Sequence, residues 1–93
     1  MLKINEYFDG KVKSISFQEK SGPATVGVME KGEYEFGTST KEIMTVIAGS
    51  MKVLLPGENE WKTYAAHDTF SVEAGKKFKL AIEADCSYLC LFR

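Results

Sequence analysis

Histidine is almost absent from this sequence, since His67 is the only one among 93 residues. Cysteine is nearly as rare, with Cys86 and Cys90 alone, and Arg93 is the only arginine. A zinc site is not expected, because such sites combine several histidine or cysteine ligands and nothing pairs with His67. Four positions along a strand span roughly 13 Å at about 3.3 Å per residue, beyond the ~7 Å limit between the Cα atoms of a disulfide. Both cysteines are therefore expected to be buried small hydrophobic residues.

The sequence also lacks an excess of positive charge and any long apolar run. It has 12 Lys and Arg residues and 13 Asp and Glu residues, which gives a formal net charge of −1. Nucleic acid is not an expected partner, because duplex binding requires a cationic surface. No membrane span is expected either, because apolar runs stop at about five residues where a span needs about 20. Residues 1–10 contain no apolar segment typical of a secretory signal, which predicts a cytoplasmic protein.

The length and composition are those of one small globular domain. Apolar residues make up 44% of the chain and charged residues 27%, a composition typical of globular proteins and not of intrinsically disordered ones. A domain of this size buries only about 60–65% of the surface of its unfolded chain. Pairing with a second copy would add to that burial, so we expect a homodimer.

What the sequence does contain is alternation of polar and apolar residues with a period of two. Glu33 and Glu35 alternate with Tyr34 and Phe36, which predicts a strand whose aromatic side chains point inward. Similar segments cover residues 11–17, 24–29, 33–38, 43–48, 51–55, 61–64, 69–72, 77–82 and 86–92. Short strands separated by turn signals such as Gly22-Pro23 predict an all-β sandwich or barrel. We expect the barrel over residues 11–93, with residues 1–10 as an arm packed on it or on a partner.

Two segments resemble the motifs of the cupin superfamily. In the first motif a glycine, a His-x-His, a glutamate and a final glycine line a small β-barrel, and Gly32, Glu42 and Gly49 fall on that pattern. Residues 67–78 resemble the second motif, with Gly75 in place. The resemblance implies a single cupin-like, RmlC-type jelly-roll barrel.

The histidines that bind metal in cupins are missing here. Thr38 and Thr40 stand at the positions of the first two, and Phe78 stands at the position of the third. Threonine hydroxyls bind divalent transition metals weakly and phenylalanine does not bind them, so we expect no metal and no other cofactor. His67 lies between two expected strands, where we expect a solvated turn residue rather than a catalytic acid or base.

A more specific resemblance extends over nearly the whole chain. The segments that carry it are Asn5–Phe17, Thr25–Met29, Gly32–Phe36, Met44–Gly49, Val53–Pro56 and Ser87–Cys90. They are similar to the pyrimidine/purine nucleoside phosphorylase family of small bacterial cupins. That resemblance implies phosphorolysis of many purine and pyrimidine nucleosides, with inorganic phosphate as co-substrate and free base and α-D-ribose 1-phosphate as products.

Such a reaction sets requirements that particular residues could meet. It builds positive charge on the ribose and negative charge on the departing base, so the site needs a carboxylate, an aromatic surface and an anion cradle. Glu42 is the expected catalytic carboxylate, although an exposed turn residue fits the same position. The expected substrate-binding residues are Tyr34, Phe36, Thr38, Ser39, Thr40, Lys41 and Lys52. Alternation places Tyr34, Phe36, Thr38 and Thr40 on one inward row, with core aromatics and solvated lysines as the alternative interpretation.

Two other functions fit the same pattern. A cupin barrel that has lost its metal keeps a pocket and can act as a non-catalytic sensor of small molecules. The chain could also be a structural dimer module without a ligand. An enzyme would release free base from a nucleoside and phosphate, a sensor would only gain thermal stability, and a structural module would do neither.

Overall fold

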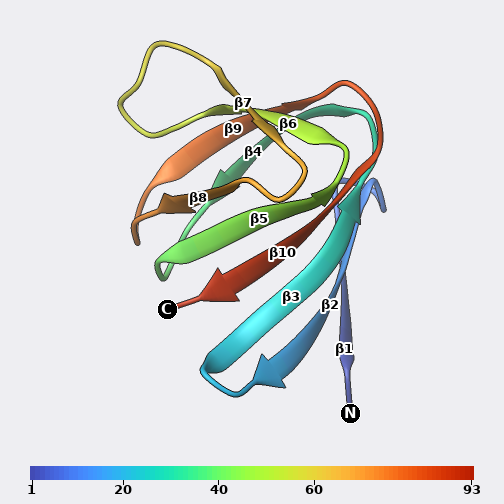
Figure 1. Ribbon diagram of the computed structural model, residues 1–93. Helices are drawn as coiled ribbons and strands as arrows, with labels where there is room; N and C mark the ends of the chain where they lie inside the picture. Colours follow the sequence, from blue (N-terminus) through green and yellow to red (C-terminus); the bar gives the residue numbers. More distant parts are fainter.

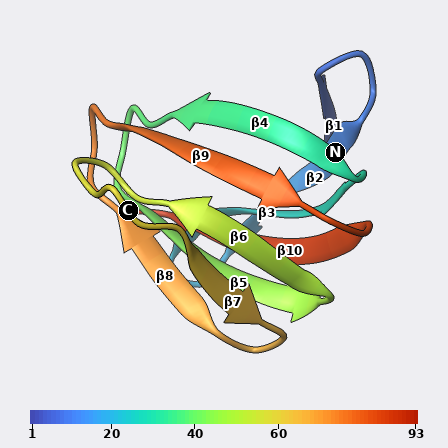
Figure 2. The same ribbon diagram turned by 90° about the horizontal axis from the view of Figure 1, so that it is seen from above.

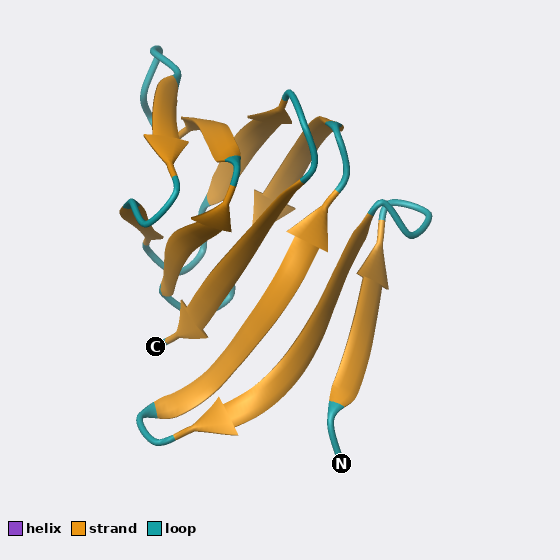
Figure 3. Cartoon of the chain, turned by 45° about the vertical axis from the view of Figure 1, so that its right-hand side comes forward, coloured by secondary structure: helices purple, strands orange, loops and turns teal.

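Ten strands form the secondary structure of the chain in a computed structural model, which describes residues 1–93 and contains no helix (Figure 3). The strands are β1 (Lys3–Tyr7), β2 (Val12–Glu19), β3 (Gly22–Met29), β4 (Gly32–Gly37), β5 (Glu42–Ala48), β6 (Ser50–Leu54), β7 (Lys62–Ala65), β8 (Thr69–Val72), β9 (Lys77–Ile82) and β10 (Cys86–Phe92). The expectation of an all-β chain is confirmed. No helix with the length and hydropathy of a membrane span is present.

The strands form two antiparallel sheets that face each other (Figures 1 and 2). The six-stranded sheet has the order β1-β2-β3-β10-β5-β8, and the four-stranded sheet has the order β4-β9-β6-β7. Strand β10 lies in the middle of the larger sheet, where it pairs with both β3 and β5. The chain passes repeatedly from one sheet to the other, so that the two sheets close around a shared interior as in a jelly roll.

The core lies between the sheets and follows the alternation of the sequence. Its most deeply buried side chains are Met29, Met51, Leu80, Val12, Val46, Val53 and Val72. Tyr34 is buried while Glu33 and Glu35 on the same strand are exposed, as the sequence pattern predicts. Cys86 and Cys90 are both buried free thiols, which also agrees with the sequence analysis.

Polarity is reversed over part of the first three strands of the larger sheet, away from the core pair Val12 and Met29. Ser14 and Thr25 point to the concave side and are buried, at 4% and 8% exposure. Ile4, Ile15 and Val26 are register partners on the opposite side and are exposed at 69%, 44% and 41%. The turn between β2 and β3 projects away from the four-stranded sheet (Figures 1 and 3). We call Ile4, Ile15 and Val26 the convex apolar face.

The structure corrects three details of the sequence-based prediction. Part of the expected N-terminal arm forms a strand, because residues 3–7 pair in register with β2. Gly22 and Pro23 lie inside β3, and the turn comes earlier, at residues 20–21. Strand β4 ends at Gly37, so residues 38–40 belong to a loop and do not extend the inward row of Tyr34 and Phe36.

Candidate functional site

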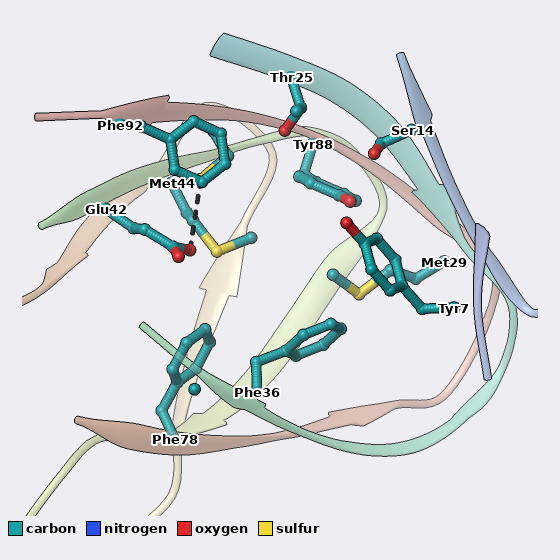
Figure 4. Close-up of a pocket in the computed structure, with 12 residues that line it drawn as sticks. Tyr7, Ser14, Thr25, Met29, Phe36, Glu42, Met44, Phe78, Tyr88 and Phe92 are labelled. Carbon is teal, nitrogen blue, oxygen red and sulfur yellow. Dashed lines mark hydrogen bonds between the residues drawn. The ribbon is translucent and has the colours of Figure 1, made fainter. Parts of the chain in front are cut away.

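A cavity of about 180 Å³ lies between the two sheets. It is lined by Tyr7, Ser14, Thr25, Met29, Phe36, Gly37, Glu42, Met44, Phe78, Tyr88, Cys90 and Phe92 (Figure 4). These side chains come from seven strands of both sheets, and β10 alone contributes three of them. Apolar walls with a few converging polar groups are typical of sites for small organic molecules.

One wall of the cavity is aromatic. Phe36 on β4 and Phe78 on β9 are register partners. Their rings stack with a centroid separation of 5.9 Å and an interplanar angle of 28°, and Phe92 approaches from the other sheet (Figure 4). A planar heterocycle would find aromatic faces on two sides of this space.

Glu42 is the only charged side chain of the lining. It is the first residue of β5, where its register partners are Phe92 on β10 and Val72 on β8. The carboxyl group is half-buried among these apolar neighbours, and desolvation raises its pKa. The thiol of Cys90 donates a hydrogen bond to Oε1 over 3.5 Å, which works against that rise (Figure 4). Glu42 is therefore easier to protonate than a glutamate on the surface.

The phenol of Tyr88 lies deeper in the cavity, over a glycine. Burial raises the pKa of Tyr88 to about 12, so the hydroxyl keeps its proton. A Cβ atom added at Gly27 on β3 would lie 2.6 Å from this hydroxyl oxygen and 2.7 Å from the carbonyl oxygen of Lys13. Only glycine lets β3 pass this close beneath the phenol. Burial also raises the pKa of the Cys90 thiol on the same strand.

Tyr7 closes one side of the cavity from the N-terminal hairpin (Figure 4). The connection to β2 contains two consecutive non-glycine residues in the left-handed region, Phe8 at φ 54° and Asp9 at φ 57°, followed by Gly10 at 83°. Such a conformation costs about 1–2 kcal/mol per non-glycine residue. It places the Phe8 ring 5.0 Å from that of Tyr34 and 5.3 Å from that of Phe36, and these contacts hold the hairpin against the four-stranded sheet.

The structure brings two of the residues predicted from the sequence to this cavity. Phe36 and Glu42 line it. Tyr34 lies behind Phe36, with ring centroids 6.3 Å apart, and its hydroxyl donates to the carbonyl oxygen of Glu30 over 2.5 Å. Tyr34 therefore supports the aromatic wall from behind and does not line the cavity.

The other predicted residues lie outside the cavity lining. Ser39 and Thr40 are exposed in the loop between β4 and β5. Lys41 and Lys52 are exposed and form ion pairs, with Glu73 over 3.6 Å and with Glu83 over 2.9 Å.

Thr38 forms hydrogen bonds that connect the loop after β4 to the loop between β8 and β9. Its hydroxyl donates to the carbonyl oxygen of Glu73 over 2.7 Å and accepts from the amide of Lys76 over 3.1 Å. The amide of Gly75 also donates to the carbonyl oxygen of Thr38 over 2.9 Å. The hydroxyl of Thr38 is thus already engaged by the backbone.

The donors at the cupin metal positions do not fit a metal ion. Thr38 is engaged in the loop contact, Thr40 is exposed and Phe78 belongs to the aromatic wall. Nowhere do three or more His, Cys, Asp or Glu side chains come together in a way that could hold an ion. His67 lies in a turn, as the sequence predicts, at a left-handed φ of 78°.

Several lining residues were not identified from the sequence, namely Tyr7, Ser14, Thr25, Tyr88 and Cys90. A signal for two of them is present. Ser14 on β2 and Thr25 on β3 each stand next to an aliphatic residue, Ile15 and Val26, that points to the other side of the sheet. This alternation indicates strands with one polar side, although it does not say which side faces the interior. Tyr7 and Tyr88 carry no such signal, because only the pairing of distant strands brings them together.

Comparisons with known proteins point to the same family over nearly the whole length of the chain. The sequence model of the family described as "Pyrimidine/purine nucleoside phosphorylase" matches residues 2–92. A protein of that name from Pseudomonas aeruginosa is 57% identical over 93 residues, covering 100% of both chains. Another from Marinobacter nauticus is 54% identical over 92 residues, covering 99% of both.

Solved structures show the same fold. A protein of unknown function from Vibrio parahaemolyticus superposes with a TM-score of 0.94 at 42% identity, covering 97% of this chain and 96% of that one. An RmlC-like cupin from Shewanella frigidimarina gives a TM-score of 0.74 at 19% identity, over 98% of this chain and 82% of that one. The fold of the chain is the all-β cupin fold.

Proposed function

Because the chain belongs to the pyrimidine/purine nucleoside phosphorylase family, we propose that it cleaves purine and pyrimidine nucleosides with inorganic phosphate. The products are the free base and α-D-ribose 1-phosphate. The observation that carries this proposal is the pairing, within one cavity, of a stacked aromatic wall with a single half-buried carboxyl group. The protein would then be a transferase of the glycosyltransferase class.

The aromatic wall supports recognition of the base by shape rather than by hydrogen bonds. Phe36, Phe78 and Phe92 offer ring faces and no hydrogen-bonding groups. Stacking accepts any planar heterocycle, since every nucleobase has a π-face. A site of this kind suits the broad range of bases that we propose.

Glu42 is the proposed catalytic residue. Its carboxylate would place negative charge beside the developing ribose cation, and its surroundings add a second property. Desolvation raises the pKa of its carboxyl, which suits the transfer of a proton to the departing base. A base that leaves with a proton carries no negative charge, so this transfer lowers the barrier to breaking the glycosidic bond.

The remaining expectations from the sequence continue as proposals. Tyr34 would act on the substrate through Phe36, and Thr38, Ser39, Thr40, Lys41 and Lys52 remain predicted substrate-binding residues. No metal takes part in the proposed reaction, and inorganic phosphate is the only co-substrate. We also propose a homodimer in the cytoplasm.

The direct test is to incubate the protein with uridine or adenosine, with and without inorganic phosphate. Free base and ribose 1-phosphate are separated and quantified by liquid chromatography. We expect both products in equal amounts, only when phosphate is present. Base released without phosphate would indicate hydrolysis, and base absent from every nucleoside would refute the proposal.

The same samples distinguish the sensor interpretation. A sensor would raise its melting temperature with nucleoside and release no base, because stabilisation requires only binding to the folded state. Release of base in a phosphate-dependent manner excludes it.

A further inference from the structure

The volume of the cavity shows that it holds only part of the substrates. An apolar cavity of about 150 Å³ holds one benzene molecule, and the cavity here measures about 180 Å³. It therefore has room for one planar heterocycle, whereas a nucleoside and a phosphate ion together need considerably more. The rest of the substrates must lie in an adjoining space.

Such a space exists beside the cavity. A groove of about 390 Å³ runs over the ends of β1, β2, β3 and β10, and it is lined by Met1, Leu2, Lys3, Ser16, Phe17, Gln18, Pro23, Ala24, Thr25 and Phe92. Thr25 and Phe92 line both the groove and the cavity. The two spaces therefore meet at these two residues.

Strand register places a cation and two hydroxyls in this groove. Lys3, Ser16 and Thr25 are direct partners on three neighbouring strands. Partners in an antiparallel pair point to the same side of the sheet, so Lys3 and Ser16 share the concave side with Thr25. The next partner in the same row is Cys90, which lines the cavity.

The polar groups of this row are free to bind an anion. Lys3 is one of the lysines that form no ion pair, so no carboxylate already neutralises its charge. The cavity itself contains no Lys, Arg or His.

The hydroxyl of Ser16 is oriented for donation. Its oxygen accepts a hydrogen bond of 2.8 Å from the side-chain amide of Asn5, which leaves its own proton free to donate. A donor that is fixed before the ligand arrives loses little entropy on binding.

We propose that the groove is the phosphate subsite of the proposed phosphorolysis, and the inference rests on that function. The ammonium group of Lys3 neutralises phosphate, and the hydroxyls of Ser16 and Thr25 donate hydrogen bonds to its oxygens. The base occupies the cavity, and the ribose lies across Thr25 and Phe92. Because Phe92 is the register partner of Glu42, the catalytic carboxyl lies beside this junction.

This arrangement fits the stereochemistry of the reaction. A phosphate oxygen forms its bond to C1′ from the groove while the bond from C1′ to the base nitrogen breaks toward the cavity, so the configuration inverts from β to α. The bonding electron pair goes to the base nitrogen, which takes a proton from Glu42. The proton that the bound phosphate gives up returns to Glu42, so that atoms and charge balance.

The test compares Lys3→Gln with Lys62→Gln, a control that removes an exposed lysine from the distant strand β7. One charge-assisted hydrogen bond contributes about 1.5–3 kcal/mol, or roughly a tenfold change in affinity at the lower end. We expect Lys3→Gln to raise the KM for phosphate about tenfold and to leave the KM for nucleoside and the melting temperature unchanged. Lys62→Gln should match wild type in all three.

A titration of each protein with inorganic phosphate alone, followed by calorimetry, separates this inference from the proposed function. Weaker phosphate binding by Lys3→Gln supports the subsite, whether or not nucleosides are cleaved. Equal KM and equal phosphate affinity in Lys3→Gln and wild type would overturn it. If wild type cleaves nucleosides and Lys3→Gln behaves identically, only the subsite is refuted.

Discussion

At the scale of single residues, the cavity depends on a carboxyl group in an apolar setting. We predict that Glu42→Gln lowers turnover by about 10²-fold or more, because a general acid contributes 10²–10⁴-fold. Wild-type turnover should fall as the pH rises through the raised pKa of Glu42, and the variant should lack this decline. Steady-state rates across a pH series provide the measurement. Glu35→Gln, which changes an exposed carboxyl on β4, is the matched control.

The same substitution has a consequence for stability. The folded state holds the proton of Glu42 more tightly than the unfolded chain, in which the pKa of the glutamate is close to its ordinary value of 4.5. As the pH rises, the unfolded chain loses this proton first, so stability falls from about that pH up to the raised folded pKa. We predict that urea unfolding of Glu42→Gln lacks this decline. Identical pH dependence in both proteins would show that Glu42 is as well solvated as a surface residue.

At the scale of elements, β2 is held by its pairing with β3, while the turn between β1 and β2 packs on the four-stranded sheet through one ring, that of Phe8. Phe8 packs on Tyr34 and Phe36 from a strained connection. Burying a phenylalanine fully contributes about 3–5 kcal/mol relative to alanine, and Phe8 is 42% exposed. We predict that Phe8→Ala lowers the free energy of unfolding by about 1–2 kcal/mol. The loss should affect β1 more than the other strands.

Hydrogen exchange measures this effect strand by strand. Amides of β1 should exchange faster in Phe8→Ala, while those of β9 and β10 should keep their protection. Because Tyr7 belongs to the same hairpin, the KM for nucleoside should rise as well. Unchanged exchange in β1 would mean that pairing with β2 is sufficient to hold β1 in place.

Alternation in the sequence was sufficient to predict most strands, and the motif spacing was sufficient to predict Glu42 at the cavity. Phe36 followed because the acidic and aromatic residues of β4 alternate strictly. Lys3 and Ser16 could not be found in this way, because the apolar residues beside them in the alternation, Ile4, Ile15 and Val26, occupy the convex side. Alternating aliphatic residues normally indicate the side of a strand that faces the core, but on these strands they lie on the outer side. Only the pairing of the strands shows which side faces the cavity.

At the scale of the whole molecule, the reaction should be independent of metal. The positions of the cupin histidines hold side chains that do not fit an ion. Phosphate is already anionic and nucleophilic, so the reaction needs no metal-activated water. We predict that protein treated with EDTA releases base at the untreated rate. Activity lost on chelation and restored by zinc or manganese would contradict this.

The convex apolar face predicts pairing with a second copy. Ile4, Ile15 and Val26 form a row across three strands, and such exposed apolar surface is typical of protein interfaces. We predict that Val26→Glu converts a dimer into a monomer, because a charge would be buried without a partner. Light scattering after gel filtration measures the mass, with Thr63→Glu on β7 as control. A wild-type mass equal to one chain would contradict the dimer.

The position of β10 has a consequence for how the protein is made. Ribosomes release a chain from its N-terminus, so β3 and β5 emerge well before residues 86–92, which must lie between them. Until then the larger sheet stays in two pieces with open edges, a state that invites pairing with other chains. Tyr88, Cys90 and Phe92 arrive with the same strand. A nascent chain therefore gains its closed barrel and its cavity in one late step of synthesis.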